Sequence, residues 1–342
     1  MNTDVLFPPY HPGHPRQATA MLDYCSRAHG TRQGTPWLTD PVAEFFRLVY
    51  GEPPAWRKLH PLCWMGVCAR TLILDRFANT VLAAWSREPS LSVWSLGAGF
   101  DARWARLPLM ASGKVAVHEW DAPELLRAKR KLLLRSPWVV AYERVRAHSL
   151  EIDEADPADE PVPPKGSGPD AGVPAKRSPH CRWEEALRDA AAQEKGPVLV
   201  IAEGLFDLLP PRSKGRLLKV LAETLPRAVV VFDTLNEAAA AYDNKNPARY
   251  TGDSSLRTYG LADDAGRLLL ENGWGDGDTR RKRFPGGSGL PPPRLVETPL
   301  MVSALRLNAQ RLPLLHGRNG LAGATGVWGS CRETAERSAI GR

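Results

Sequence analysis

Short apolar segments alternate with helical patterns through the middle of this 342-residue chain, and this alternation limits the fold more than any other feature. The segments expected to form strands are Leu91–Leu96, Lys114–Trp120, Gly196–Leu205 and Arg227–Leu235, with a further strand or strand edge at Trp138–Val145. The helical patterns between them are Ala122–Leu134 and Ser213–Leu225. Strands that alternate with helices form a parallel sheet covered on both faces. The sequence therefore predicts an α/β fold with a mostly parallel sheet flanked by helices.

Apolar residues recur at helical spacing before this alternation begins. The three helices expected there are Thr19–His29, Pro41–Tyr50 and Leu62–Trp85. Asp40 is placed to cap the second of them, with proline in the first helical position. The front of the chain is therefore expected to be entirely helical.

These patterns divide the chain into three regions. We expect residues 1–90 to form an N-terminal helical lid, residues 91–315 the α/β core, and residues 316–342 a flexible tail. Residues 153–179 are rich in proline and poor in large apolar side chains, so they cannot bury enough surface to offset the entropy of ordering. We expect a disordered insertion there.

The charge pattern bears on possible partners. The net charge of +7 permits an acidic partner without demanding one. Basic residues gather in Arg127–Arg135 and Arg280–Arg283, but no aromatic side chains alternate with them as in a nucleic-acid groove. The apolar stretch Leu62–Trp85 contains three charged residues. We therefore expect neither a nucleic-acid partner nor a membrane span.

The five cysteines are an odd number without a C-x-x-C pair, which predicts reduced thiols in a cytoplasmic protein. The first residues lack the basic start and apolar core of a signal peptide. His60, Cys63 and Cys68 have no second ligand pair at the spacing of a zinc site, so we expect no metal.

Two glycines, Gly97 and Gly99, directly follow the first expected strand. Ligands of parallel sheets bind beyond the carboxyl ends of the strands, and a turn without Cβ atoms lets a ligand approach the main-chain amides. The third glycine position of a dinucleotide-binding turn holds Ala102, a tolerated variant. Asp101 would place a negative charge near a pyrophosphate. This favours a ligand with a cationic centre and no phosphate, such as S-adenosyl-L-methionine.

Three charged residues match the parts of this ligand. Asp121 ends the second strand, where a carboxylate receives ribose hydroxyls. Arg70 lies on an apolar stripe of its helix and needs an anion, which the methionine carboxylate would supply. Glu203 ends a buried strand and would lie near the amino group or the sulfonium.

Each assignment has a structural alternative. Asp121 could be the N-cap of the helix that begins at Ala122–Pro123. Arg70 could pair with Glu44 or Asp75. Glu203 could be an N-cap or the partner of a structural ion pair.

Several ordered segments carry a family resemblance. They are "WLTDPVAEFF", "CARTLILDRF", "SLGAGFDARWARL", "HEWDAPELLRAKRKLL", "LVIAEGLFDLLP" and "LLLENGW". With them, the chain from Gln17 to Arg311, apart from the insertion, resembles the leucine carboxyl methyltransferase family of S-adenosylmethionine-dependent O-methyltransferases. The segments "CARTLILDRF" and "LVIAEGLFDLLP" are more similar to the bacterial branch of the family, which acts on small molecules.

The resemblance implies a Rossmann-like class I methyltransferase fold with an N-terminal helical lid. It also implies a role for each matching residue: Arg70 and, more loosely, Arg27 at the cofactor carboxylate; Gly97 and Gly99 in the cofactor turn; Asp121 at the ribose; Glu203 at the methyl-transfer site. Ser149 and Leu150 stand where relatives carry the Asp-Leu pair that contacts the adenine, and Leu208 replaces a usual tyrosine. The adenine contact therefore departs from the family pattern.

The expected reaction is methyl transfer to an oxygen of a small-molecule natural product. A carboxyl oxygen is the favoured acceptor, and a phenol or enol oxygen is the alternative. A carboxylate acceptor is already ionised and needs no base, whereas a phenol or enol would be helped by one, such as Glu203 or His148. The front helices and Asn236–Tyr259 would form the lid and the acceptor pocket.

Three alternatives remain open at this point. They are methylation of a protein's C-terminal leucine, a paralogue that binds S-adenosylmethionine without turning it over, and a basic protein that binds nucleic acid.

Overall fold

The computed structural model describes residues 15–34, 38–53, 56–57, 59, 61–152, 182–235, 237–245, 257–261, 265–274, 295–296 and 325–330. The expected insertion at 153–179 and most of the expected tail at 316–342 lie outside these residues. In the described part of the chain, no helix is long and apolar enough to cross a membrane.

The centre of the protein is one sheet with the strand order β3-β2-β1-β4-β5-β7-β6. Its parallel strands are β1 (Ser92–Leu96), β2 (Ala116–Asp121), β3 (Val145–Ser149), β4 (Val198–Ala202) and β5 (Ala228–Leu235). Two antiparallel strands, β7 (Thr325–Ser330) and β6 (Leu295–Val296), extend the sheet beyond β5. The order reverses between β1 and β4, so the carboxyl ends of these two strands form the switch point of the sheet, where such folds bind ligands.

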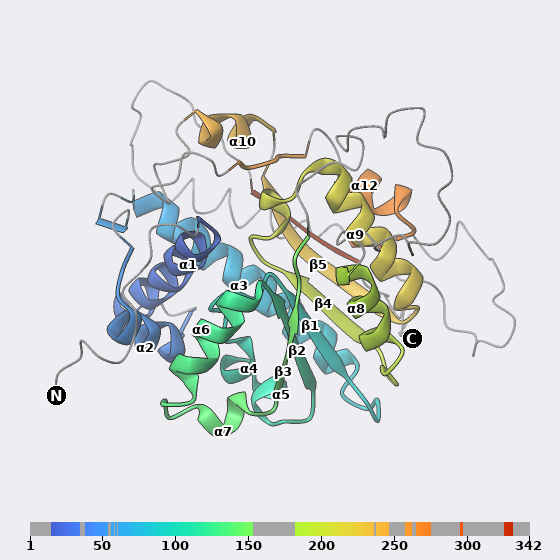
Figure 1. The fold of residues 1–342 in the computed structure, drawn as a ribbon, viewed down its shortest axis with the longest axis horizontal. Helices are drawn as coiled ribbons and strands as arrows, with labels where there is room; N and C mark the ends of the chain where they lie inside the picture. Colours follow the sequence, from blue (N-terminus) through green and yellow to red (C-terminus); the bar gives the residue numbers. More distant parts are fainter. Residues whose placement is uncertain are drawn as a thin grey trace, which may run out of the picture.

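Helices cover both faces of the sheet, as the alternation predicts (Figure 1). The helices on the face that Val93 lines are α1 (Pro15–Arg32), α2 (Pro41–Tyr50), α3 (Pro61–Ala84), α4 (Arg103–Arg106), α5 (Pro108–Ala111), α6 (Pro123–Leu133) and α7 (Val139–Tyr142). Those on the face that Trp94 lines are α8 (Arg182–Ala191), α9 (Pro211–Thr224) and α12 (Ala265–Glu271). The switch of face between neighbouring residues follows from the two-residue period of a strand.

Two short elements lie close to the ends of β4 and β5: the single 3-10 turn η5 (Phe206–Leu208) and helix α10 (Glu237–Asn244). All five residues of β1 and of β4 are buried, which explains why β4 is continuously apolar and why the residues of β1 are apolar apart from Ser92 and Ser95. The predicted cap of α2 is confirmed, because the Asp40 carboxylate accepts a hydrogen bond of 2.9 Å from the amide of Ala43.

The strand expected at Trp138–Val145 is wrong. Residues Val139–Tyr142 form the short helix α7, and β3 begins only at Val145, beside Val117 of β2. The Oγ of Ser136 accepts a hydrogen bond of 3.1 Å from the amide of Trp138 and so starts a helical turn. A short apolar run does not distinguish a strand from a helix, and one residue of this run, Val140, is exposed.

Part of the expected flexible tail is a strand. Residues Thr325–Ser330 form β7 and pair with β5, in the register Leu235↔Thr325 to Val231↔Gly329. Its sequence, TGVWGS, contains two glycines and little periodicity, so no local pattern indicated a strand.

Candidate active site

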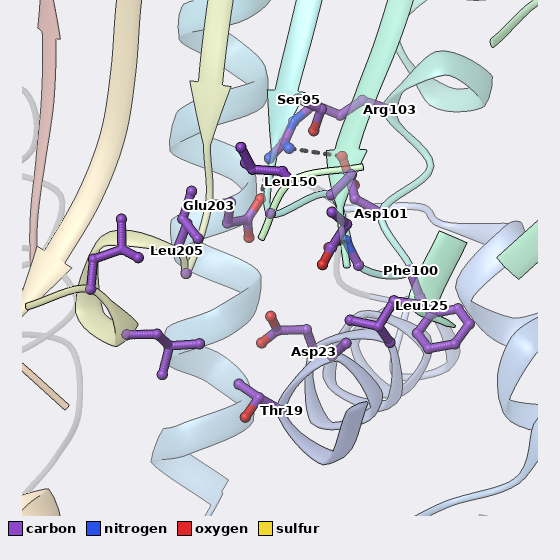
Figure 2. Close-up of a pocket in the computed structure, with 18 of the residues that line it drawn as sticks. Thr19, Asp23, Ser95, Phe100, Asp101, Arg103, Leu125, Leu150, Glu203 and Leu205 are labelled. Carbon is purple, nitrogen blue, oxygen red and sulfur yellow. Dashed lines mark hydrogen bonds and ion pairs between the residues drawn. The ribbon is translucent and has the colours of Figure 1, made fainter. Parts of the chain in front are cut away.

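A pocket lies at the switch point of the sheet. Its wall comes from α1, the turn after β1, the end of β2, the segment after β3 and the segment after β4 (Figure 2). The pocket brings together six of the residues predicted from the sequence: Arg27, Gly97, Gly99, Asp121, Leu150 and Glu203. Parts of the chain far apart in sequence therefore meet where a doubly wound sheet binds its ligand.

The turn after β1 requires both of its glycines. Gly97 has φ +62° and Gly99 has φ +43°, in the left-handed region that side chains disfavour. A Cβ on Gly97 would lie 3.0 Å from the Cβ of Leu205, and one on Gly99 would lie 3.2 Å from the Cβ of Ala20. The bare backbone thus has two causes: the bend of the turn and the close approach of its neighbours.

We expect Gly97→Ala to lower the free energy of unfolding by about 1–2 kcal/mol, because alanine strains the left-handed backbone and meets Leu205. Urea denaturation measures the effect. Gly66→Ala in α3 is the matched control: no atom lies within 4 Å of its added Cβ, and we expect a gain of about 0.5–1 kcal/mol. A Gly97→Ala protein as stable as the wild type would contradict the assigned strain.

Asp121 is the last residue of β2, and its carboxylate forms part of the pocket wall. It accepts hydrogen bonds from the amide of Gly99 (2.5 Å) and from that of Ala122 (2.7 Å). The N-cap of α6 is Ala122, without a side-chain cap, so the N-cap alternative for Asp121 does not hold. This carboxylate orients the glycine turn and also faces the pocket.

A network of arginines and carboxylates underlies the turn. Arg103, which is 2% exposed, contacts Asp75 (2.7 Å), Asp101 (2.8 Å) and Glu203. Arg106 contacts the same Asp101 at 2.9 Å. Burial would raise the pKa of Asp101, but the two guanidinium groups outweigh it and hold that pKa well below its usual range.

These contacts correct the electrostatic argument made from Asp101. The sequence suggested that its charge would disfavour a pyrophosphate, but two arginines balance this charge within the protein. The preference for a cationic ligand therefore cannot rest on Asp101.

Glu203 follows β4, and both of its carboxylate oxygens are engaged. One accepts from Arg70 Nε (3.2 Å) and Thr71 Oγ1 (2.6 Å), and the other accepts from Arg103. Burial would raise the pKa of Glu203, yet Arg103 and Arg70 lower it to about 2. Glu203 is therefore ionised at neutral pH and is a poor proton acceptor.

The other candidate base, His148, lies away from the pocket. Its Nε2 is 3.0 Å from Nδ1 of His118, and its ring stacks on Trp120 with 4.2 Å between centroids. Burial lowers its pKa. His148 is not among the described residues that line the pocket.

Arg70 reaches the site from α3 and pairs with three carboxylates: Asp23 (3.0 Å), Glu203 (3.2 Å) and Asp233 (3.3 Å). The two partners that the sequence suggested for it bind other arginines, because Glu44 pairs with Arg32 and Asp75 with Arg103 and Arg106. Arg70 is not among the described residues that line the pocket, but two of its partners, Asp23 and Glu203, are. Sequence spacing revealed none of these ion pairs.

Arg27 is 2% exposed on α1 and forms part of the pocket wall. Its Nε pairs with Asp40 at 3.0 Å, and its Nη2 donates to the carbonyl oxygen of Phe100 at 3.2 Å. Arg27 therefore joins α1 and the cap of α2 to the glycine turn.

Ser149 and Leu150, which stand in place of the family's adenine-contacting pair, differ in their relation to the pocket. Ser149 ends β3 with an exposed side chain and is not in the described wall, whereas Leu150 and Ile152 are buried and line it. Neighbouring side chains in extended chain point to opposite sides, so Ser149 and Leu150 cannot both face the pocket.

Sequence analysis missed Asp23, Arg103 and Asp233. A signal for Asp23 was present: with Thr19 and Arg27 it forms one i, i+4 stripe of polar side chains along its helix. No comparable signal marked Asp233, which lies within a buried strand.

The sheet order, the glycine turn and the acid that ends β2 define a Rossmann-like protein with a pocket at its switch point, where such folds bind ligands. The profile of the leucine carboxyl methyltransferase family matches residues 25–222, more than half of the chain. The chain belongs to this family and is an S-adenosylmethionine-dependent methyltransferase.

The chain is similar to the following known proteins. A "Putative S-adenosyl-L-methionine-dependent methyltransferase" of Mycobacterium marinum is 28% identical over 241 residues, which cover 65% of this chain and 67% of the relative. A protein of the same name from Mycobacterium tuberculosis is 24% identical over 308 residues, or 80% and 78% of the two chains. The solved magnesium protoporphyrin IX methyltransferase of Synechocystis is 15% identical, with a TM-score of 0.37 over 67% of this chain and 83% of that chain.

Proposed function

We propose that the protein is an O-methyltransferase that transfers the methyl group of S-adenosylmethionine to a carboxyl oxygen of a small organic acid. One observation carries the choice of acceptor. The described pocket wall contains no histidine, lysine, cysteine or tyrosine, and its glutamate, Glu203, has a pKa of about 2. The pKa of Asp23 is raised by burial, but its carboxylate is paired with Arg70. A carboxylate acceptor needs no base, which suits such a wall.

The residues present fit the cofactor. In the proposed arrangement the cofactor carboxylate is held by Arg27 of the wall and by Arg70, which pairs with Asp23 of the wall. The bare turn at Gly97 and Gly99 admits the cofactor, and Asp121 receives the ribose hydroxyls. The adenine would lie against a buried apolar surface formed by Leu125, Leu150 and Ile152. When bound, the cofactor supplies a methyl group on a cationic sulfur, and the protein supplies position and electrostatics.

The wall beyond β4 supports an apolar acceptor. Leu205, Leu208 and Leu209 form this part of the wall, and all three side chains are apolar. Leu208 stands where relatives carry tyrosine, so this chain presents a methyl group in place of a hydroxyl. We expect the acceptor to be a mainly apolar acid.

The direct test incubates the protein with methyl-labelled cofactor and matched panels of carboxylic acids, phenols and peptides that end in leucine. Label in a base-labile ester of a small acid supports the proposal. Label in the peptide alone would identify a protein methyltransferase, and label in phenols alone a hydroxyl methyltransferase. Cofactor binding without transfer to any member would favour a non-catalytic paralogue.

We expect the pH dependence to separate the acceptors. A carboxylic acid is fully ionised above about pH 6, whereas the fraction of phenolate rises about tenfold per pH unit below a pKa of about 10. The ratio of the initial rates on a matched phenol and acid should therefore rise with pH. The ratio is the useful quantity because Asp207 and Lys214, with pKa values of about 7 and about 8 caused by burial, titrate in the same range. If the rate on the acid rose with pH as steeply as the rate on the phenol, the proposal that a carboxylate acceptor needs no base would be wrong.

A further inference from the structure

Asp23 is an acid inside the pocket that the proposed reaction does not use. It projects from α1 toward the ends of the strands, where Figure 2 shows its carboxylate facing the cavity. Its Oδ1 accepts a hydrogen bond of 3.0 Å from Nη2 of Arg70, and its side chain is 21% exposed. A carboxylate in this position can contact a charged group of a bound ligand.

The three carboxylates around Arg70 are not equivalent. Glu203 is 7% exposed and is also held by Thr71 and Arg103. Asp233 is 1% exposed and accepts a hydrogen bond of 2.7 Å from the amide of Gly204. Asp23 is the most exposed of the three, and its ion pair within the described residues is with Arg70 alone. It is therefore the partner that an incoming carboxylate displaces.

Displacement changes the charge balance at Asp23. When a ligand carboxylate binds Arg70, Asp23 loses its ion-pair partner. An unpaired, largely buried carboxylate raises the free energy of the complex. The cost disappears if the same ligand carries a cation next to its carboxylate. An α-amino acid group has this arrangement, since its ammonium and carboxylate are attached to one carbon.

We propose that Asp23 binds the α-ammonium group of the cofactor while Arg70 binds the adjacent carboxylate. One internal ion pair, Arg70–Asp23, is exchanged for two ion pairs with the ligand. The pair thus acts as a receptor for a zwitterion rather than for a carboxylate alone. This inference rests on the proposed function, because it requires the cofactor to place its amino acid end at Arg70.

The exchange predicts a specific order of affinities. 5′-Methylthioadenosine lacks the whole amino acid end and leaves the Arg70–Asp23 pair intact. The analogue of S-adenosylhomocysteine with hydrogen in place of the amino group breaks this pair and leaves Asp23 unpaired. The deaminated analogue should therefore bind no more tightly than methylthioadenosine, despite its additional carboxylate. S-Adenosylhomocysteine should bind at least about tenfold more tightly than both.

Calorimetric titration of these three compounds into the wild type and into Asp23→Asn tests the inference. We expect the variant to lose about tenfold in affinity for S-adenosylhomocysteine. In the variant, the affinities for S-adenosylhomocysteine and for the deaminated analogue should differ by no more than about threefold. Its affinity for methylthioadenosine should stay unchanged. Glu44→Gln on α2 removes an acid that pairs with Arg32, outside the pocket wall, and should keep the wild-type order.

The outcomes separate this inference from the proposed function. Wild-type protein that binds none of the three compounds would overturn both. Tight binding of S-adenosylhomocysteine, with the deaminated analogue equally tight or with the full preference retained in Asp23→Asn, would overturn only the role of Asp23. The wild-type order of affinities tests the exchange even if the variant fails to fold.

Discussion

Replacing Arg103 by methionine is expected to lower the free energy of unfolding by about 3–5 kcal/mol. The Arg103 guanidinium is 2% exposed and contacts Asp75, Asp101 and Glu203, each of which is largely buried. Removing one cation therefore leaves three largely buried carboxylates with less compensation for their charge. Urea denaturation at pH 7 measures the loss, and a loss below about 1 kcal/mol would show that the network is not needed for stability.

The comparison needs a control and a second pH. Arg188→Met removes an arginine that is 46% exposed and paired with Glu184 one turn away, and it should cost less than about 1 kcal/mol. The arginines lower the pKa values of Asp101 and Glu203, so their stabilisation is complete above the unfolded-state values of about 4 and is lost as the pH falls below them. The difference between Arg103→Met and the wild type should therefore shrink as the pH falls from about 5 to about 3.

Asp121→Ala is expected to weaken the binding of S-adenosylhomocysteine about 100-fold. Two hydrogen bonds from ribose hydroxyls to a carboxylate contribute about 1.5–3 kcal/mol each, so their loss costs about 3 kcal/mol or more. The substitution also removes the acceptor of the Gly99 amide, which loosens the turn beneath the cofactor. Calorimetric titration measures the affinity, and circular dichroism confirms that the variant folds.

Ser149→Ala is the matched control for Asp121→Ala, because Ser149 ends the neighbouring strand with an exposed side chain. We expect its affinity to stay within about twofold of the wild type, since replacing an exposed polar side chain outside the pocket wall changes little. A large loss in Ser149→Ala would restore the adenine contact that the family pattern suggested. An unchanged affinity in Asp121→Ala would remove the ribose assignment and with it the orientation of the cofactor.

Local patterns carried much of the fold. The mainly apolar run at β1, the continuous apolar run at β4, the amphipathic segments at α6 and α9 and the cap at Asp40 are properties of residues close together in the chain. The glycine turn is also a local property, because an apolar run followed by Gly97 and Gly99 marks the end of a strand. Asp121 and Glu203 were found for the same reason: each lies at the carboxyl end of a strand, and parallel strands bring these ends to one edge.

The sequence therefore specified the alternation of strands and helices, the edge of the sheet at which a ligand binds, and the residues at the strand ends. Folding alone settled which charges meet there, because Arg70 lies 47 positions from Asp23 and 133 from Glu203, and Arg103 lies 100 from Glu203. Coulomb interactions depend on distance in space and on burial, and neither is a function of sequence spacing. The same cause explains the ionised state of Glu203 and the balanced charge of Asp101. Tertiary packing likewise decides that Asp23, an ordinary acid on a helix in the sequence, lines the pocket.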